Sequence, residues 1–228
     1  MLVDLHVHTK LSSDSNVAPE QYLEAAARNS IPLGAICFTE HRLFPTDPEL
    51  DRTYADLSER FGIRIFKGTE ADTDLGHLLI FGVTSALMKR FDLDGRMHRA
   101  EHLIEAVHGE GGISIPAHPF RDSGYGTRLD ALLAKLGSAL TAVEAINGQN
   151  SHDQNIAAIT AAEKLGMTAV GGSDAHFPTP KWFLTCATEL EREVSTVEEL
   201  CAEIRAGRAR PYQFPPDPSI RGKVGGVR

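Results

Sequence analysis

Two histidines, two residues apart, end the first apolar run of the chain, and this pair constrains the fold more than any other feature. Residues 1–8, MLVDLHVH, predict a short buried strand. Because residues two apart in a strand face the same side, we expect His6 and His8 to project together, with Leu5 and Val7 on the other side. A divalent metal ion would satisfy both buried imidazoles. Two core histidines bonded to backbone carbonyls explain the pair equally well, because two ligands do not complete a metal site.

Apolar runs and helical segments alternate along the rest of the chain, which indicates parallel βαβ units. We expect helices between most of the strands, a last helix at 195–206, and strands at 1–8, 32–39, 63–66, 77–81, 113–117, 142–146 and 168–170. The prediction is an α/β fold, a TIM-like distorted (β/α)7 barrel over residues 1–207, with a Pro/Gly-rich C-terminal tail at 208–228. An open doubly wound sheet is the alternative.

Polar side chains gather where the expected strands end. Six of the seven strand ends carry His, Glu, Asp or Asn, and the carboxyl ends of barrel strands are where such folds keep their chemistry. One histidine comes at the start of its strand instead. The candidate metal ligands are His6, His8, Asp14, His41, Glu70, His77, His118, Asp174 and His176. Nine such groups are too many for one divalent ion, and buried together without cations they could not be satisfied.

Charge and composition argue against several classes of protein. The formal net charge is −8, whereas nonspecific nucleic-acid binding needs a basic footprint, so we expect no stable complex with duplex nucleic acid. No apolar run approaches a membrane span and no signal peptide is visible, so we expect no membrane partner and a cytoplasmic location. The three cysteines, Cys37, Cys186 and Cys201, are scattered, which argues against a disulfide framework or a zinc knuckle.

The candidate ligands stand in five short motifs. These are Asp4-Leu-His-Val-His-Thr9 with Ser13-Asp14, Thr39-Glu-His41, Gly68-Thr-Glu70, Ala117-His-Pro-Phe120 and Gly172-Ser-Asp-Ala-His176. In this order, and at strand ends, they resemble the PHP (polymerase and histidinol phosphatase) family of metal-dependent phosphoesterases. The resemblance runs from Met1 to about Phe177, and the segment Val143-Glu-Ala-Ile-Asn147 is similar to this family as well.

The resemblance implies a site for three divalent cations. The first would bind His6, His8, Glu70 and Asp174. The second would share Glu70 and add His77 and His118, and the third would bind Asp14, His41 and His176. A shared carboxylate can hold two ions about 3.5–4 Å apart, as in two-metal phosphoryl-transfer enzymes. Histidine and carboxylate ligands without thiolate accept manganese, iron or zinc, so the identity of the metals stays open.

The implied reaction is hydrolysis of a phosphate ester. Metals lower the pKa of bound water and neutralise phosphoryl oxygens, and a hydroxide bridging the first two ions would attack phosphorus. The residues implied in catalysis are His6, His8, Glu70, His118, Asp174 and His176. Arg121 follows the histidine of Ala117-His-Pro-Phe120 closely, and its guanidinium suits bidentate binding of the substrate phosphate. An ordinary ion pair at the rim is the alternative for Arg121.

Several functions remain open from the sequence. The preferred substrate is a small phosphomonoester or a nucleotide, and a nuclease or nucleotide bisphosphatase acting on short oligonucleotides is the main alternative. An amidohydrolase-like barrel that hydrolyses C–N bonds is less favoured, because no lysine on a barrel strand fits the carboxylated lysine that such enzymes often use. A metal-binding regulatory barrel without turnover is a further alternative. The motif His98-Arg-Ala-Glu101-His102 matches the pattern of inverted zinc proteases, but a solvated helix face explains it.

Overall fold

The computed structural model describes residues 1–122 and 125–215. Within these residues the strands are β1 (Leu2–Val7), β2 (Leu33–His41), β3 (Arg64–Thr73), β4 (Gly76–Phe81), β5 (Ile113–Pro116), β6 (Ala142–Asn147), β7 (Thr168–Gly172), β8 (Cys186–Leu190) and β9 (Ala209–Gln213). The helices are α1 (Pro19–Arg28), α2 (Pro48–Phe61), α3 (Ser85–Arg90), α4 (Ala100–Gly109), α5 (Leu129–Leu136), the 3₁₀ turn η1 (Gly137–Ala139), α6 (His152–Leu165) and α7 (Val197–Arg205). Among the described helices, none is long and apolar enough to cross a membrane.

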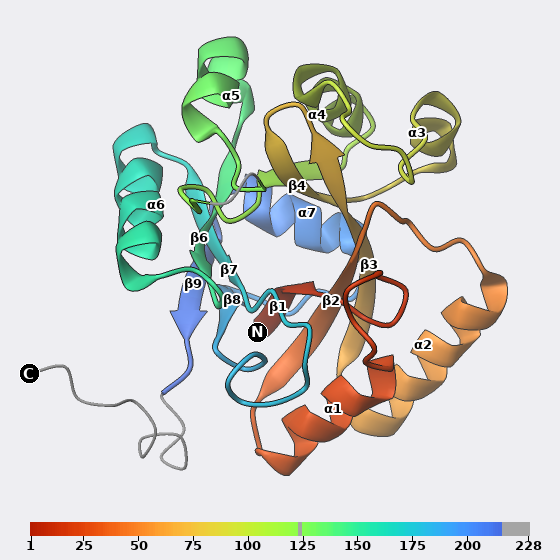
Figure 1. Ribbon diagram of the computed structural model, residues 1–228. Helices are drawn as coiled ribbons and strands as arrows, with labels where there is room; N and C mark the ends of the chain where they lie inside the picture. The colour runs from red at the N-terminus through yellow and green to blue at the C-terminus, as the bar shows by residue number, and fades with distance from the viewer. Residues whose placement is uncertain (123–124, 216–228) are drawn as a thin grey trace, which may run out of the picture.

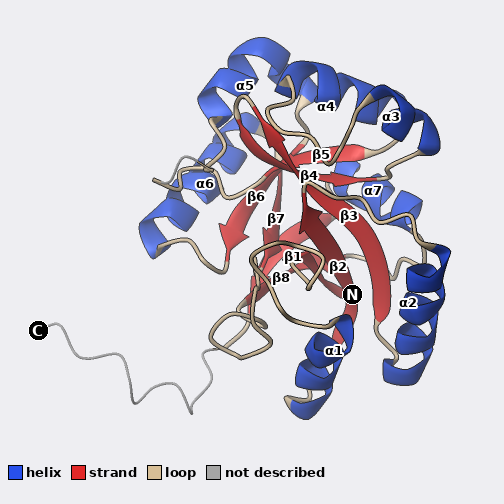
Figure 2. Cartoon of the chain, turned by 45° about the vertical axis from the view of Figure 1, so that its right-hand side comes forward, coloured by secondary structure: helices blue, strands red, loops and turns tan. Residues whose placement is uncertain are grey.

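The strands form one large sheet and one separate pair. Seven strands are hydrogen-bonded in the order β5-β4-β3-β2-β1-β8-β9, and β6 pairs with β7. β1, β2 and β3 are parallel to one another, whereas β4 and β8 run antiparallel to their neighbours. The large sheet curls, and most helices lie around its outside (Figures 1 and 2). The described chain is therefore a mixed α/β fold with a curled half-barrel sheet.

The expected α/β class is confirmed, but a fully closed barrel of parallel strands is not. The difference begins at residues 74–75, which alone separate β3 from β4. Two residues can join antiparallel strands in a hairpin, whereas a parallel connection needs a dozen residues or more. For this reason β4 runs opposite to β3, with no helix between them.

The reversal of β4 brings its first residues to the rim where the parallel strands end. Along the β3–β4 ladder Asp72 pairs with His77, and along the β4–β5 ladder Leu78 pairs with Pro116. The start of β4 consequently lies beside the ends of β3 and β5. This direction explains why His77 is the one candidate ligand at the beginning of a strand.

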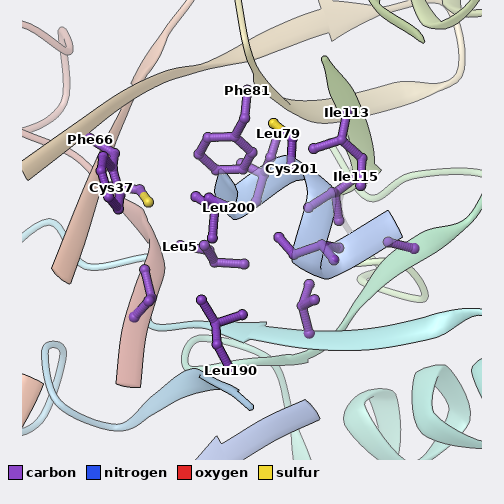
Figure 3. Close-up of a cluster of buried hydrophobic side chains, with 14 of the residues drawn as sticks. Leu5, Cys37, Phe66, Leu79, Phe81, Ile113, Ile115, Leu190, Leu200 and Cys201 are labelled. Carbon is purple, nitrogen blue, oxygen red and sulfur yellow. The ribbon is translucent and has the colours of Figure 1, made fainter. Parts of the chain in front are cut away.

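Helix α7 fills the inside of the curled sheet. Its Leu200 and Cys201 are fully buried and belong to one apolar cluster with Leu5, Phe81 and Ile115 of the strands. Figure 3 shows Leu200 and Cys201 among the strand side chains of this cluster. Burying a leucine side chain contributes roughly 1.5–3 kcal/mol, so α7 is a substantial part of the core. Phe81 ends β4 at the opposite end from the histidine, which leaves the other rim to polar groups.

Two further apolar clusters attach the outer helices to the sheet. One joins α1 and α2 to β1 and β2 and contains the fully buried rings of Tyr22 and Phe38. The other joins α3, α4 and α5 to β4 and β6 and contains Leu87, Leu103 and Leu132. Each of the helices α1 to α5 therefore packs with apolar side chains against the strands.

The expected alternation along β1 holds only in part. Val7 belongs to the cluster beneath α1, but Leu5 belongs to the inner cluster with α7, so these two do not share a side. The pairing of β1 with β2 shifts register between Asp4 and Val7, which interrupts the two-residue alternation. His6 and His8 nevertheless reach the same group of polar residues.

The segment expected as a tail begins with a strand. Ala209–Gln213 forms β9, which pairs antiparallel with β8 at the edge of the hydrogen-bonded sheet. An edge position tolerates Pro211, because proline has no N–H to donate to a further strand. Residues 216–228 of the expected tail lie outside the described residues.

Candidate metal centre

All nine candidate ligands lie at the polar rim of the curled sheet. They come from strand ends and from the loops directly after them: His6, His8 and Asp14 from β1 and its loop, His41 from β2, Glu70 from β3, His77 from the start of β4, His118 from beyond β5, and Asp174 and His176 from beyond β7. Nitrogen and oxygen atoms of different members approach within 2.7–3.5 Å. The structure brings the whole predicted set together.

Four of these side chains surround one point. Nε2 of His6 lies 3.2 Å from Oε2 of Glu70 and 3.5 Å from Oδ1 of Asp174. Nε2 of His8 lies 3.3 and 3.4 Å from the same two oxygens. The two Nε2 atoms and Oε2 of Glu70 are buried and have no hydrogen-bond partner among the described residues. Convergent, unpartnered imidazole and carboxylate atoms are the donor set that binds manganese, iron or zinc, so the residues present fit a divalent cation.

The other carboxylate oxygen of Glu70, Oε1, lies beside a second pair of histidines. Oε1 lies 2.7 Å from Nδ1 of His77 and 2.8 Å from Nε2 of His118. Oε2 also approaches Nδ1 of His41 at 2.9 Å. Glu70 is fully buried, and its two oxygens face different histidines. A carboxylate placed in this way can be shared by two cations.

A third group lies nearer to solvent. Oδ2 of Asp14 lies 3.2 Å from Nε2 of His41 and 3.3 Å from Nε2 of His176. The ring of His8 stacks on both of these histidines, with ring centroids 4.2 and 4.4 Å away. The Asp14 side chain is 52% exposed, so this group faces the opening of the site.

The backbone at two ligands adopts conformations that side chains rarely take. Asp174 has φ 54° and His118 has φ 30°, both in the left-handed region. Such conformations cost about 1–3 kcal/mol each, and they concentrate at functional sites where the surroundings enforce them. For Asp174 the constraint comes from β1, because its N–H donates to the carbonyl of His6 at 2.7 Å. His8 donates in return to the carbonyl of Ala175 at 3.0 Å.

Electrostatics sets the ionisation of the central ligands. Burial alone would raise the pKa of the Glu70 and Asp174 carboxyls, but nearby positive charge, first that of His6, holds both pKa values well below their usual range. Burial lowers the pKa of His8 to about 3. At pH 7 the two carboxyls are therefore ionised and His8 is neutral, which are the forms that bind divalent cations.

Several polar residues support the ligands and were not among the predicted site residues. Nδ1 of His6 lies 2.9 Å from Oε1 of Glu144, and Nδ1 of His8 lies 3.3 Å from the hydroxyl of Ser12. That hydroxyl donates to the buried Glu40 at 2.6 Å. Outer partners of this kind fix the orientation and tautomer of a ligating histidine. The available signal was a lone acid inside an apolar strand, which needs a partner when it is buried.

A cavity of about 450 Å³ lies above the ligands. Arg121 lines it, and its guanidinium donates to Oδ2 of Asp174 at 2.7 Å and to the side-chain oxygens of Asn147 and Asn150 at 2.8 and 2.9 Å. The predicted substrate-binding arginine therefore faces the site and is also ion-paired with a ligand. Two further lining residues are aromatic, Tyr125 and Trp182.

The protease-like motif has no part in this centre. His102 lies on α4 with its side chain 60% exposed, and His98 precedes that helix. In the described ranges, every group of residues able to hold a metal ion belongs to the nine-residue cluster. A solvated helix face remains the explanation of that motif.

Comparison with known proteins identifies related sequences and folds. A family model described as the PHP domain matches residues 4–143, which is more than half of the chain. A second model, described as PHP-associated, matches residues 152–209. No curated protein matches the sequence significantly.

Several solved structures share the fold. PsfC from Pseudomonas syringae PB-5123 has a TM-score of 0.69 and 21% identity, over 97% of this chain and 94% of that one. A candidate metal-dependent phosphoesterase from Bifidobacterium adolescentis has a TM-score of 0.57 and 18% identity, over 90% and 96% of the two chains. Endonuclease Q from Pyrococcus furiosus has a TM-score of 0.64 and 18% identity, over 92% of this chain but 57% of its own. At these identities the likeness establishes the fold.

Proposed function

This chain belongs to the PHP domain family of metal-dependent phosphoesterases, and we propose that it hydrolyses a small phosphate ester at the centre described above. The observation that carries the proposal is the position of Glu70. Its carboxylate is fully buried and lies within 3.3 Å of five histidines. A carboxylate has about four acceptor positions, so five imidazoles around it are better explained as ligands that share cations with it.

We infer three groups of ligands from these contacts. The first is His6, His8, Glu70 and Asp174, the second Glu70, His77 and His118, and the third Asp14, His41 and His176. Divalent cations held there would activate a water molecule and neutralise phosphoryl oxygens. The contacts within each group, at 2.7–3.5 Å, support this division. Manganese, iron and zinc all suit the donor atoms.

The remaining residues of the cavity would bind and orient the ester. The guanidinium of Arg121 faces the cavity beside Asp174 and would bind the phosphate, for which its planar donors are suited. The leaving group would contact Tyr125 and Trp182. A cavity of about 450 Å³ is the size of a small-molecule site, which favours a monoester or a nucleotide over a long polymer.

The proposal includes the barrel-like arrangement expected from the sequence. Val7 at the end of β1 makes a parallel bridge with Ala175, just beyond β7. The N–H of Asp174 donates to the carbonyl of His6 in the same region. These links support the inference that the β6–β7 pair continues the curl of the large sheet around the site.

A nuclease acting on short oligonucleotides is the second candidate. The observation in its favour is the fold shared with endonuclease Q, which was solved with a duplex containing an abasic lesion. The net charge of −8 argues against a long nucleic-acid substrate. This chain also spans only 58% of the length of endonuclease Q. An amidohydrolase-like reaction is less favoured, since no lysine is among the described residues that line the cavity.

The experiment is phosphate release from a panel of phosphate esters. The purified protein is stripped of metal, reloaded with manganese, iron or zinc, and assayed with sugar phosphates, nucleoside mono- and bisphosphates and short oligonucleotides. We expect activity with at least one monoester, lost in His118→Ala and Asp174→Ala and kept in His102→Ala, whose histidine lies on the exposed face of α4. Bound metal near three per chain supports the trinuclear centre, and one or two would favour the amidohydrolase-like alternative. Absence of release with every metal would contradict the proposal.

A further inference from the structure

Glu144 links three segments at the base of the metal centre. It is the third residue of β6, it is fully buried, and its two oxygens have different partners. Oε1 lies 2.9 Å from Nδ1 of His6. Oε2 accepts hydrogen bonds from the backbone N–H of His118 at 2.6 Å and from Nδ2 of Asn147 at 3.0 Å. The side chain thus joins β6 to β1 and to the residue beyond β5.

The contact between His6 and Glu144 also depends on the absence of a side chain at Gly172. A Cβ atom on Gly172 would lie 2.5 Å from Cβ of His6 and 2.9 Å from Oε1 of Glu144. Real Cβ atoms do not approach other atoms so closely. The close approach of β7 to β1 therefore needs glycine here, and the His6–Glu144 contact lies in a space that the surrounding chain keeps open.

The direction of the hydrogen bonds follows from the groups involved. A backbone N–H can only donate, so the Glu144 atom that faces the N–H of His118 must be an acceptor. With Oε2 accepting two N–H groups, we assign the proton in the contact with Oε1 to Nδ1 of His6. A cation that binds Nε2 replaces any proton on that atom, so the N–H that His6 keeps is the Nδ1–H held by Glu144, and the lone pair of Nε2 goes to the metal. That Nε2 is the atom 3.2 Å from Glu70 and 3.5 Å from Asp174.

We propose that Glu144 is the positioning residue that holds His6 in its Nδ1–H tautomer, so that Nε2 is presented as a metal ligand. The inference rests on the proposed function, since it assigns the orientation of one ligand of that centre. The inference goes beyond the proposed function because it assigns a role to Glu144, which is not among the described residues that line the cavity. Partners of this kind typically change metal affinity by 10–100-fold when they are replaced.

Glu144→Gln tests the tautomer with almost no change of shape. The N–H of His118 holds the amide oxygen at the position of Oε2, so the amide NH₂ must face Nδ1 of His6. Nδ1 then has to accept, so His6 must keep a proton on Nε2, where it blocks the ligand lone pair. We expect zinc affinity, measured by competition with a chromophoric chelator, to fall about 10–100-fold. In E144Q without zinc at pH 8, long-range ¹H–¹⁵N spectra of labelled histidine are expected to show a His6 proton on Nε2 and none on Nδ1, whereas the wild type keeps a proton on Nδ1.

Glu144→Ala separates this role from a merely structural one. Alanine removes more packing and leaves the buried N–H of His118 without a partner, so E144A is expected to melt at a lower temperature than E144Q. It leaves Nδ1 of His6 facing no fixed donor, so the ligand tautomer stays accessible and E144A is expected to bind zinc more tightly than E144Q. The two variants therefore rank in opposite orders for stability and for zinc affinity. If E144Q binds zinc as tightly as E144A or the wild type, the proposal is wrong.

Glu203→Gln is the matched control, because Glu203 is another fully buried glutamate and pairs with Arg208 and Arg192 away from the centre. Its zinc affinity is expected to equal that of the wild type, and a loss as large as in E144Q would also overturn the proposal. Failure of the wild type to bind zinc, manganese or iron would instead contradict the proposed function. The two failures are thereby distinguishable.

Discussion

Nε2 of His118 lies 2.8 Å from Oε1 of Glu70, although β4 separates β3, which contains Glu70, from β5, which precedes His118. The contact spans a strand because the sheet curls and because His118 lies beyond the end of β5 with φ 30°. His77, at the start of the intervening β4, contacts the same oxygen at 2.7 Å. One carboxylate oxygen on β3 is thus contacted by one histidine from β4 and by another from just beyond β5. Glu70 is the residue through which the groups of ligands are connected.

Glu70→Gln is expected to abolish high-affinity metal binding. The substitution keeps the shape of the side chain but removes the negative charge and makes one of the two terminal atoms a donor facing histidines. Losing a direct ligand should weaken binding by more than the 10–100-fold typical of outer partners. Chelator competition with zinc and phosphate release with the same protein would measure both effects. Glu189→Gln is the control, since Glu189 pairs with Arg210 on β8 and β9, and a weak effect of E70Q would remove Glu70 from the centre.

The convergence of the nine residues could be predicted from the sequence. Each is a histidine or an acid at or just beyond an apolar run, as with Glu70 and His118, and parallel strands bring such ends to one rim. His77 did not fit that rule, because its strand runs the other way. The sequence predicted strands at 63–66 and 77–81, so the reversal became visible only in the structure, where β3 extends to Thr73 and the short Asp74-Leu75 connection permits only an antiparallel neighbour. That these residues bind cations stays a prediction.

Other features depend on tertiary packing and could not be predicted. The amphipathic pattern of residues 195–206 indicated a helix, but not that Leu200 would fill the inside of the sheet. Glu144 was visible as an acid in an apolar strand, yet nothing in the sequence says which histidine its carboxylate meets. Glu144 meets His6 because β6 and β7 lie beside β1. That arrangement is determined by contacts between segments far apart in the sequence.

Ser12→Ala is expected to weaken metal binding by about 10-fold. The Ser12 hydroxyl donates to Glu40, accepts the N–H of His41 at 3.0 Å, and lies 3.3 Å from Nδ1 of His8. Without it, His8 loses the partner that orients its ring. Zinc titration of the metal-free variant would show the loss. Ser58→Ala is the matched control, because that hydroxyl also makes two hydrogen bonds but lies on α2, and equal losses in both variants would refute the role of Ser12.

Arg121→Ala is expected to raise KM by about 10–100-fold, which corresponds to the loss of a charge-assisted contact with phosphate. The guanidinium also pairs with Asp174, so an effect of the substitution on metal binding has to be separated from its effect on phosphate binding. If Arg121 served only to hold Asp174, zinc affinity would fall and KM would not change at saturating metal. Steady-state kinetics together with zinc titration distinguishes these outcomes. Arg99→Ala, which removes an arginine paired with Asp74, is expected to change neither.

Asp4→Asn is expected to remove a specific pH dependence from the stability of the metal-free protein. Burial raises the pKa of the Asp4 carboxyl from 3.8 to about 7, against the hydrogen bonds that its Oδ1 accepts from the N–H groups of Ser173 and His6, and its Oδ2 has no partner. Because the folded state holds the proton more tightly than the unfolded chain, the stabilisation is complete below pH 3.8 and is lost as the pH rises to about 7. The unfolding free energy of the wild type, relative to D4N, should therefore fall by about 3 kcal/mol between pH 4 and pH 7 and level off above about pH 8. Denaturant unfolding of both proteins in chelator at pH 4, 5.5, 7 and 8.5 measures this difference, since the remaining groups titrate alike in both. A constant difference across the series would show that the Asp4 carboxyl titrates normally in the folded protein.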